Sequence, residues 1–297
     1  MESPELIALL RGGRLAVLTG AGISTDSGIP DYRGPDSPPS NPMTIRQFTS
    51  ERAFRQRYWA RNELGWRHMD QRTPNAGHRA LAMLENAGVV TGLITQNVDL
   101  LHTKAGSKAV VNLHGTFVQV VCLDCGHTMS RTALAGLLEA ANPGFLERAA
   151  SVGSIAVAPD ADAAVADTAD FRIVDCPACG GMLKPDIVYF GESVPKCRVE
   201  KAYAMVDDAD ALLVAGSSLT VYSGYRFVRH AAARGMPIAI VNRGPTRGDD
   251  LATVKVDNGC SPILALLADE LPALAKTRSL HRDEIVGMHS GATHLGG

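Results

Sequence analysis

Four of the six cysteines occur in two pairs that have the spacing of metal ligands. In each pair two residues separate the cysteines, and glycine follows the second cysteine, at Gly126 and at Gly180-Gly181. Glycine permits the tight turn that aims backbone and sulfur at one ion, so four thiolates would form a closed tetrahedral zinc site with a structural role. The predicted ligands are Cys122, Cys125, Cys176 and Cys179. The alternative is two unrelated cysteine pairs without a metal, and the isolated Cys197 and Cys260 are expected to be ordinary thiols.

A glycine-containing loop, Gly20-Ala21-Gly22-Ile23-Ser24, directly follows the apolar run at residues 15–19. Glycines there let the backbone approach a pyrophosphate, and the start of a helix would favour its negative charge, so the loop suggests a dinucleotide. The spacing departs from the G-x-G-x-x-G pattern of dehydrogenases, because Thr25 stands where the third glycine belongs and the next glycine is Gly28. Hydride transfer is therefore not supported, while a simple turn without phosphate binding stays open.

Both sites need a scaffold, and four apolar runs predict its strands. They lie at residues 15–19, 89–95, 211–215 and 237–241 and are apolar almost throughout, which is typical of parallel strands covered on both faces. Helices are expected at 44–63, at 76–86 after a cap at Asn75, and at 222–234, with a short helix from Ser3-Pro4-Glu5 to Gly12-Gly13. The order indicates a doubly wound α/β fold, in which ligands gather at the carboxyl ends of the strands.

The middle of the chain departs from this alternation of strands and helices. Residues 122–179 carry turn residues, a weak helical pattern at 131–141 and an Ala- and Asp-rich stretch at 156–170, which together indicate an inserted small module. The polar, Gly- and His-containing segment after residue 275 is expected to be a flexible tail.

The composition argues against several classes of protein, among them nucleic-acid-binding and membrane proteins. The chain has 297 residues, of which 45% are hydrophobic, so it can bury a substantial core. Its 29 basic and 31 acidic residues nearly cancel, and the insert has few basic or aromatic side chains, so stable nucleic-acid binding is not expected. No apolar run approaches the about 20 residues of a membrane span, and the N-terminus lacks a signal or transit pattern, so we expect no membrane partner and a cytoplasmic location.

Beyond the glycine loop, a set of motifs occurs in the order in which the sirtuin family has them. They are GAGISTDSGIPDYRG at 20–34, TQNVD at 95–99, HG at 114–115, the paired CxxC, KPDIVYFGE at 184–192, GSSL at 216–219 and VN at 241–242. Over about residues 5–270 the chain therefore resembles the NAD-dependent protein deacylases of the sirtuin family. RQRYWARN at 55–62 and SGYRF at 223–227 further resemble its class II branch, which includes the mitochondrial lipoamidase and ADP-ribosyltransferase sirtuin.

The resemblance implies a Rossmann-like doubly wound parallel sheet with an inserted small zinc-binding module. NAD and an acyl-lysine protein or peptide would meet in the cleft between them. The expected boundaries are 1–117 and 188–275 for the Rossmann-like NAD-binding domain, 118–187 for the zinc module and 276–297 for the tail.

Residue roles carry over by motif position. The resemblance places the pyrophosphate against Gly20, Ala21 and Gly22, and places Asp31 and Arg33 in a flexible cofactor loop. Nicotinamide and its ribose would lie among Gln96, Asn97 and Asp99, and adenosine beside Gly216, Ser217, Ser218, Asn242 and Cys260. Ser24, Tyr32, Arg243 and Gly244 complete the cofactor-binding set. Val188, Tyr189 and Phe190 would border the substrate channel, where an extended peptide can add as a strand.

The implied reaction is NAD-dependent removal of an acyl group from lysine. The acyl oxygen attacks the anomeric carbon of the nicotinamide ribose, nicotinamide leaves, and a ribose hydroxyl must then be deprotonated to capture the acyl group, which gives 2′-O-acyl-ADP-ribose. His114 is the expected base, because an imidazole with an ordinary pKa near ~6.5 can accept a proton at neutral pH. Asn97 and Asp99 are its expected orienting partners, and His78, His102 and His127 are expected to be structural.

Three other functions stay open. A protein ADP-ribosyltransferase would keep the NAD site and transfer ADP-ribose to a protein side chain. A zinc module that binds nucleic acid or a partner without catalysis is disfavoured by the acidic insert, and a dehydrogenase is disfavoured by the missing third glycine. Deacylation is the preferred hypothesis because His114, Asn97 and Asp99 are all present.

Overall fold

Parallel strands form the centre of the larger part of the molecule, as the apolar runs predict. The structure is a computed structural model, and it describes residues 3–34, 42–150 and 168–271. Six strands have the order β3-β2-β1-β7-β8-β9, and every neighbouring pair is parallel. They are β1 (Leu15–Thr19), β2 (Val90–Thr95), β3 (Val110–Asn112), β7 (Ala211–Ala215), β8 (Ile238–Val241) and β9 (Val254–Val256). The strand order runs outward in opposite directions from β1 and from β7, so it reverses between these two strands.

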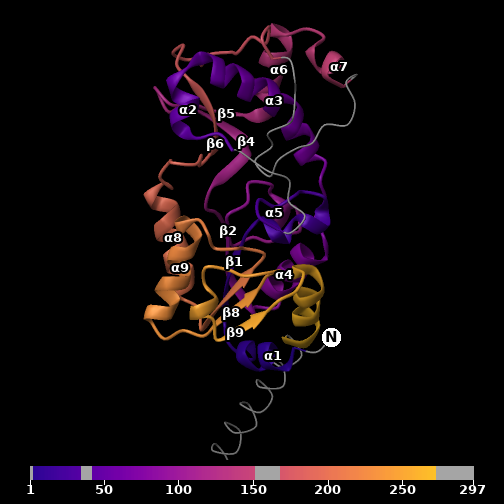
Figure 1. Cartoon of the computed structure of the whole chain (residues 1–297), viewed down its shortest axis with the longest axis vertical. Helices are drawn as coiled ribbons and strands as arrows, with labels where there is room; N and C mark the ends of the chain where they lie inside the picture. Colours follow the sequence, from indigo (N-terminus) through magenta and orange to yellow (C-terminus); the bar gives the residue numbers. More distant parts are fainter. Residues whose placement is uncertain (1–2, 35–41, 151–167, 272–297) are drawn as a thin grey trace, which may run out of the picture.

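Helices cover both faces of this sheet (Figure 1). On β1, Leu15 and Val17 face a core made with α1 (Pro4–Leu10), α4 (Ala76–Asn86) and the helical residues 260–271. Ala16 and Leu18 face the opposite core, made with α8 (Lys196–Asp207) and α9 (Tyr222–Ala233). Successive side chains of a strand point to opposite faces, and here both faces are buried, which is why the strands are continuous apolar runs. The predicted doubly wound α/β fold is confirmed.

Local capping sets several helix boundaries. Asn75 caps α4 as predicted, because its side-chain oxygen accepts hydrogen bonds from the backbone N–H groups of Gly77 and His78. Ser3 precedes α1, but its side chain makes no capping hydrogen bond. The proline in the first turn is therefore the local feature that favours the start of this helix. Helix α8 is not among the predicted helices, although Pro195 immediately before it is a start signal.

The single helix expected at 44–63 is wrong. The chain forms α2 (Ile45–Ser50) and α3 (Arg52–Asp70), separated by the extended residue Glu51. The hydroxyls of Thr49 and Ser50 donate hydrogen bonds to carbonyl oxygens of the preceding turn, at 2.9 and 3.2 Å. Such side-chain bonds compete with the backbone bonds that continue a helix, and the periodicity of the sequence does not reveal them.

A smaller layer lies beyond the carboxyl ends of the parallel strands and is built on three antiparallel strands in the order β5-β4-β6 (Figure 1). They are β4 (Gly115–Cys122), β5 (Thr128–Ser130) and β6 (Leu183–Ile187). The helices of this layer are α2, α3, α6 (Arg131–Ala141) and α7 (Phe145–Ala150), and α6 confirms the weak pattern at 131–141. Phe48, Tyr58 and Trp59 of α2 and α3 share one core with Leu183 and Ile187 of β6.

A buried ion pair joins α6 to α3. The guanidinium of Arg131, only 1% exposed, lies 2.6 Å from a carboxylate oxygen of Glu63 and donates to the side-chain oxygen of Asn62 at 3.0 Å. It also lies over the rings of Trp59 and Trp66. Removing one partner of such a pair leaves an uncompensated buried charge, so this contact fixes how the two helices pack.

Two expectations fall on residues that the structure does not describe. The tail at 276–297 and most of the Ala- and Asp-rich stretch lie outside the described residues.

Within the described ranges, none of the helices is both long enough and apolar enough to cross a membrane. The remaining short elements are α5 (Leu101–Lys104) and the 3₁₀ turns η1 (Ala21–Ile23), η2 (Thr25–Ser27) and η3 (Asp249–Leu251).

Candidate active site

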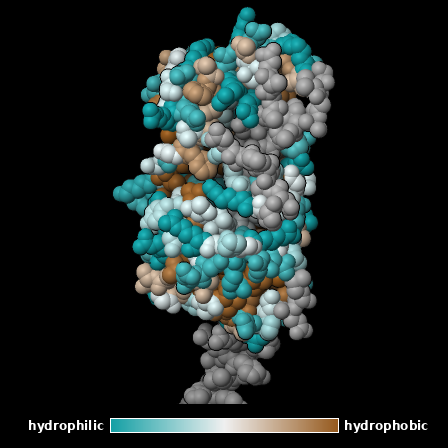
Figure 2. Space-filling model, viewed as in Figure 1, coloured by the Kyte–Doolittle hydropathy of each residue, from teal (hydrophilic) through white to brown (hydrophobic). Residues whose placement is uncertain are grey.

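The carboxyl ends of the parallel strands border a cavity of about 920 Å³. Loops that follow β1, β2, β7 and β8 line it from the larger sheet, and residues 187–194 line it from the smaller layer. In Figure 2 apolar surface is visible at the level between the two layers. The cavity includes the point where the strand order reverses between β1 and β7, and open α/β sheets bind ligands at this position.

Every predicted catalytic, cofactor-binding and substrate residue lines this cavity except Cys260. Cys260 is 4% exposed, and its sulfur lies 3.8 Å from the carbonyl oxygen of Val241 at the end of β8. Burial raises the pKa of this thiol to about 12, so it is a neutral group packed behind the cavity wall.

Close packing between two loops explains the glycines after β1. A Cβ atom on Gly20 would lie 2.8 Å from the carbonyl oxygen of Gly216, and one on Gly22 would lie 3.0 Å from the Cα of Gly216. Gly22 also donates its backbone N–H to that carbonyl oxygen at 2.9 Å. The glycines thus bring the loops after β1 and β7 together beside the cavity. The chain after Gly20 forms the 3₁₀ turns η1 and η2, so no α-helix starts directly at this loop.

His114 lies in the cavity wall with contacts at both ring nitrogens. Nδ1 is 2.9 Å from the carbonyl oxygen of Gln96, and Nε2 is 2.8 Å from Oγ of Ser223. A carbonyl oxygen only accepts hydrogen bonds, so Nδ1 carries the proton and Nε2 of the neutral ring keeps its lone pair. Only glycine fits the next position, because Gly115 has a φ of +80° and a Cβ there would lie 1.8 Å from the carbonyl oxygen of Asp186.

The environment of His114 lowers its pKa to about 4. Burial is the main cause, and the positive charges of Arg198 and Arg226 act in the same direction, whereas the bond to Gln96 opposes them. The sequence does not show this shift from the ordinary value of ~6.5, because it depends on burial in the fold. At neutral pH the imidazole is uncharged and able to accept a proton.

Gln96 and Ser223 hold His114, so the predicted orienting partners are wrong. Asp99 accepts hydrogen bonds from the hydroxyl of Ser24 at 2.7 Å and from a backbone N–H at 2.9 Å, and burial raises its pKa. Asn97 donates from Nδ2 to the carbonyl oxygen of Gly20 at 3.1 Å and to Ser24 at 3.2 Å. These two side chains tie the loop after β2 to the loop after β1.

Two further histidines are buried behind these loops. His78 lies 3.4 Å from the hydroxyl of Ser24, and His102 lies 2.9 Å from the hydroxyl of Thr19. Burial lowers the pKa of His78 to about 4, and burial also lowers the pKa of His102 well below its usual value. Both residues lie outside the cavity lining, in agreement with the predicted structural role.

Residues 188–190 connect the smaller layer to the cavity. Val188 donates its backbone N–H to the carbonyl oxygen of His114 at 2.8 Å, which ties this segment to the candidate base. The ring of Tyr189 is buried in the core of the smaller layer. Phe190 lies edge to face with Tyr32 of the loop after β1, at 6.2 Å between ring centres. The segment therefore spans from the core of the smaller layer to the cofactor loop.

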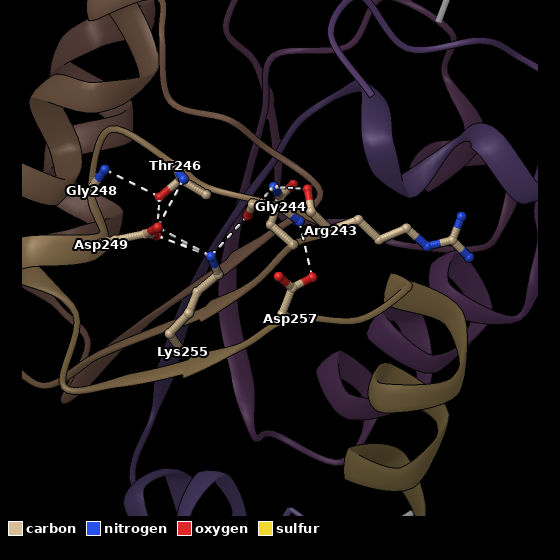
Figure 3. Close-up of polar contacts among 8 residues, drawn as sticks. Arg243, Gly244, Thr246, Gly248, Asp249, Lys255 and Asp257 are labelled. Atoms are coloured by element: carbon tan, nitrogen blue, oxygen red, sulfur yellow. Dashed lines mark hydrogen bonds and ion pairs between the residues drawn. The ribbon is translucent and has the colours of Figure 1, made fainter. Parts of the chain in front are cut away.

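A polar network fixes the loop after β8 (Figure 3). Lys255 donates from Nζ to the carbonyl oxygen of Gly244 at 2.9 Å and lies 3.2 Å from both carboxylate oxygens of Asp249. Asp257 accepts the backbone N–H of Gly244 at 3.0 Å. The side chain of Arg243, which lines the cavity, extends away from this network (Figure 3).

The four predicted metal ligands meet in the smaller layer. Their sulfur atoms all lie within 4.8 Å of one another, with 3.6 Å from Cys122 to Cys179 and 3.9 Å from Cys125 to Cys176. A tetrahedral site with Zn–S distances of about 2.3 Å requires sulfur separations of about 3.8 Å. Gly126 and Gly180, which directly follow the two pairs, adopt the positive φ angles that the predicted tight turns require. The geometry and the donor set fit a structural zinc ion.

The sequence profile of the Sir2 family matches residues 20–223, which contain the glycine loop, His114 and all four metal-ligand cysteines. The chain belongs to the Sir2 family.

Relatives of this Sir2-family chain are similar over nearly its whole length. A Mycobacterium avium (strain 104) protein named NAD-dependent protein deacetylase 1 is 76% identical over 273 residues, which cover 92% of this chain and 97% of the relative. A Streptomyces coelicolor protein of the same name is 53% identical over 266 residues, 88% of this chain and 87% of the relative. A solved structure described as Sir2–p53 peptide–NAD+ has a TM-score of 0.73 and 31% identity, and the match covers 91% of this chain and 98% of that one.

Three cavity residues on α9 of this Sir2-family chain are not among the predicted site residues, although the motif SGYRF at 223–227 contains two of them. Tyr222, Ser223 and Arg226 lie in its first turns and line the cavity. The sequence contains a usable signal, because 222–234 is a predicted helix that follows the carboxyl end of the strand at 211–215. In a doubly wound fold such a helix starts beside the ligand site.

Proposed function

We propose that this chain removes acetyl groups from lysine side chains of proteins in a reaction that consumes NAD. It is an NAD-dependent protein deacetylase of the Sir2 family, with relatives of that name at 76% and 53% identity. The geometry of His114 carries the proposal. Its Nε2 lone pair lies in the wall of a cavity that is shared by the loops predicted to bind NAD and the segment predicted to border the substrate.

The residues of the cavity fit NAD. Its volume of about 920 Å³ is near the upper end of the ~300–1,000 Å³ typical of ligand sites, so it has room for a dinucleotide and an acyl-lysine side chain. Arg33, Arg226 and Arg243 line it and offer positive charge to a pyrophosphate. When bound, NAD supplies nicotinamide as the leaving group and ADP-ribose as the acyl acceptor. The chain would hold it with the residues at 20–24, 31–33, 96–99, 216–218 and 242–244.

We assign the proton transfer to His114. The carbonyl oxygen of Gln96 accepts the Nδ1 proton, so the ring keeps the tautomer in which Nε2 is the basic atom. Because burial lowers its pKa, the ring is neutral at pH 7 and can take the proton of a substrate hydroxyl. Asn97 and Asp99 would support the cavity wall through Ser24 and Gly20.

Two finer assignments belong to the same proposal. Membership in the class II branch is supported by RQRYWARN at 55–62 and SGYRF at 223–227, and Ser223 of the second motif contacts His114. A division into a larger domain at 1–117 and 188–275 and a zinc module at 118–187 is supported by the two layers of the fold. The shared core of the smaller layer favours counting residues 42–70 with the zinc module.

The test is an assay of the purified full-length protein with NAD and acetyl-lysine peptides, with products measured by mass spectrometry. We expect nicotinamide and 2′-O-acetyl-ADP-ribose in equal amounts. Nicotinamide release with ADP-ribose attached to the protein target would instead support the ADP-ribosyltransferase alternative. Unchanged NAD with all peptides would contradict the proposal.

The lowered pKa of His114 predicts activity at mildly acidic pH. A base must be neutral, so its contribution is present above the folded-state pKa and is lost as the pH falls through about 4. At pH 6.0 a base with an ordinary pKa of ~6.5 would be only about one quarter neutral. We expect initial rates at pH 6.0 to match those at pH 7.5, measured after confirming that the protein stays folded. A threefold or larger loss at pH 6.0 would contradict the assignment.

Lys255 is expected to affect the KM for NAD, although its side chain does not line the cavity. In a Lys255→Met variant the carbonyl oxygen of Gly244 and the carboxylate of Asp249 lose their shared cation, which loosens the loop at 242–244. A loss of about 1–2 kcal/mol would raise KM for NAD roughly 5- to 30-fold and leave kcat nearly unchanged. Steady-state kinetics with varied NAD measures both. Lys196→Met, which removes an exposed lysine paired with Glu200 at 3.4 Å, is the matched control and should leave both constants unchanged.

A further inference from the structure

The basic atom of His114 is already occupied by a hydroxyl. Nδ1 donates its proton to Gln96, so Nε2 can only accept, and the hydroxyl 2.8 Å away on Ser223 must donate to it. A proton that leaves a substrate hydroxyl therefore meets Ser223 at the place where it must enter the imidazole. Either the substrate displaces this hydroxyl or the hydroxyl passes the proton on.

The contact between Ser223 and His114 is built into the fold. Ser223 is the second residue of α9, and it lines the cavity. Gly224, the next residue, lies so close to the loop after β2 that a Cβ there would be 2.5 Å from the side-chain oxygen of Gln96. The start of α9 is thus pressed against the residue that orients His114, which fixes the backbone of Ser223 beside the imidazole.

The start of α9 also suits proton transfer through this hydroxyl. Ser223 lies in the first turn of a 12-residue helix, whose N-terminal end carries partial positive charge. That charge stabilises the negative charge that develops on Oγ when the hydroxyl gives up its proton. Arg226, one turn later on the same helix, also lines the cavity and lowers the pKa of His114 by its charge.

We propose that Ser223 is a further catalytic residue, a proton relay between the hydroxyl of the bound substrate and His114. The substrate O–H bond breaks as a new O–H bond forms on Oγ of Ser223. The original Oγ–H bond breaks as an N–H bond forms on Nε2, so His114 becomes an imidazolium and Ser223 is unchanged. This inference rests on the proposed function, because it needs His114 to be the base.

The test compares Ser223→Ala and Ser223→Thr in the full-length protein. Two rates are measured for each: exchange of labelled nicotinamide into NAD, which precedes the proton transfer, and formation of acetyl-ADP-ribose, which follows it. We expect the alanine variant to lose about 10²-fold in product formation while exchange stays within about twofold. Threonine keeps a hydroxyl and should restore most of the product rate. Ser50→Ala removes an exposed serine hydroxyl on α2, outside the cavity lining, and should change neither rate.

The outcomes separate the relay from the proposed function. If Ser223→Ala forms acetyl-ADP-ribose at the wild-type rate, the relay is overturned and the deacetylase activity stands. If the variant loses nicotinamide exchange and product formation equally, the relay is overturned in favour of a structural role for Ser223. Absence of NAD cleavage in the wild type would count against the proposed function instead. If Ser223→Ala does not fold, the wild-type rate is measured in mixtures of H2O and D2O. A curved dependence on deuterium content, from two protons in flight, supports the relay, and a linear dependence overturns it.

Discussion

Replacing His114 with alanine is expected to lower deacetylation by about 10²–10⁴-fold while exchange of nicotinamide into NAD continues. The substitution removes the only atom of this side chain, Nε2, that can accept a proton, because Nδ1 is bound to Gln96. Deprotonation of the ribose hydroxyl comes after nicotinamide has left, so the earlier, reversible step does not need the base. Single-turnover measurement of acetyl-ADP-ribose, beside incorporation of labelled nicotinamide into NAD, gives both rates.

A second histidine variant controls for general damage. His230 lies on α9 and pairs with Asp207 at 2.7 Å, away from the cavity lining, so His230→Ala should leave both rates unchanged. Thermal unfolding of each variant shows whether the fold survives. Unimpaired deacetylation in His114→Ala would remove this residue from the mechanism, and an equal loss of exchange would mean that it binds substrate and does not act as a base.

Replacing Cys176 with serine is expected to remove zinc and to unfold the smaller layer. Cys122 and Cys176 are part of the core that contains Phe48 and Trp59, so the metal site and the core form one unit. Structural zinc contributes about 10–16 kcal/mol in zinc-finger peptides, which is comparable with the about 5–15 kcal/mol stability of a typical domain. We expect zinc content to fall from about one ion per chain to none and deacetylation to be lost.

Tryptophan fluorescence reports the packing of α3, a helix of this layer. The chain has two tryptophans, Trp59 and Trp66, and both lie on α3 with at most 7% exposure. A chelator added to the wild type, like the Cys176→Ser substitution, should therefore shift their emission to longer wavelength. Cys197→Ser is the matched control, because Cys197 is exposed and outside the cluster. Wild-type zinc content and emission in Cys176→Ser would contradict the assignment.

Much of the scaffold could be predicted from the sequence, because its signals are local. Strands buried on both faces must be apolar at every position, so the runs at 15–19 and 211–215 predict β1 and β7 with their observed bounds. Asn75 predicts the start of α4 because a cap is a contact between near neighbours. The helix expected at 44–63 failed because its interruption depends on side-chain bonds of Thr49 and Ser50 that no periodicity shows.

The sequence predicted which residues form the site, but it did not predict which of them contact one another. Every residue that the motifs assigned to catalysis, cofactor or substrate lines the cavity except Cys260, which is buried behind the wall. The motifs also paired His114 with Asn97 and Asp99, which belong to the same TQNVD motif as the observed partner Gln96. The observed partners are Gln96 and Ser223, at sequence separations of 18 and 109 residues.

The sequence by itself determined which residues could do the chemistry: four thiolates at metal-ligand spacing, a glycine loop after a strand, and a histidine among family motifs. Only the tertiary structure decided which atoms meet. The tautomer of His114, its lowered pKa and its contact with Ser223 depend on burial and on loops that parallel strands bring to one edge of the sheet. Hydrogen bonding and desolvation act over a few ångströms in space, and the distance along the chain does not set them.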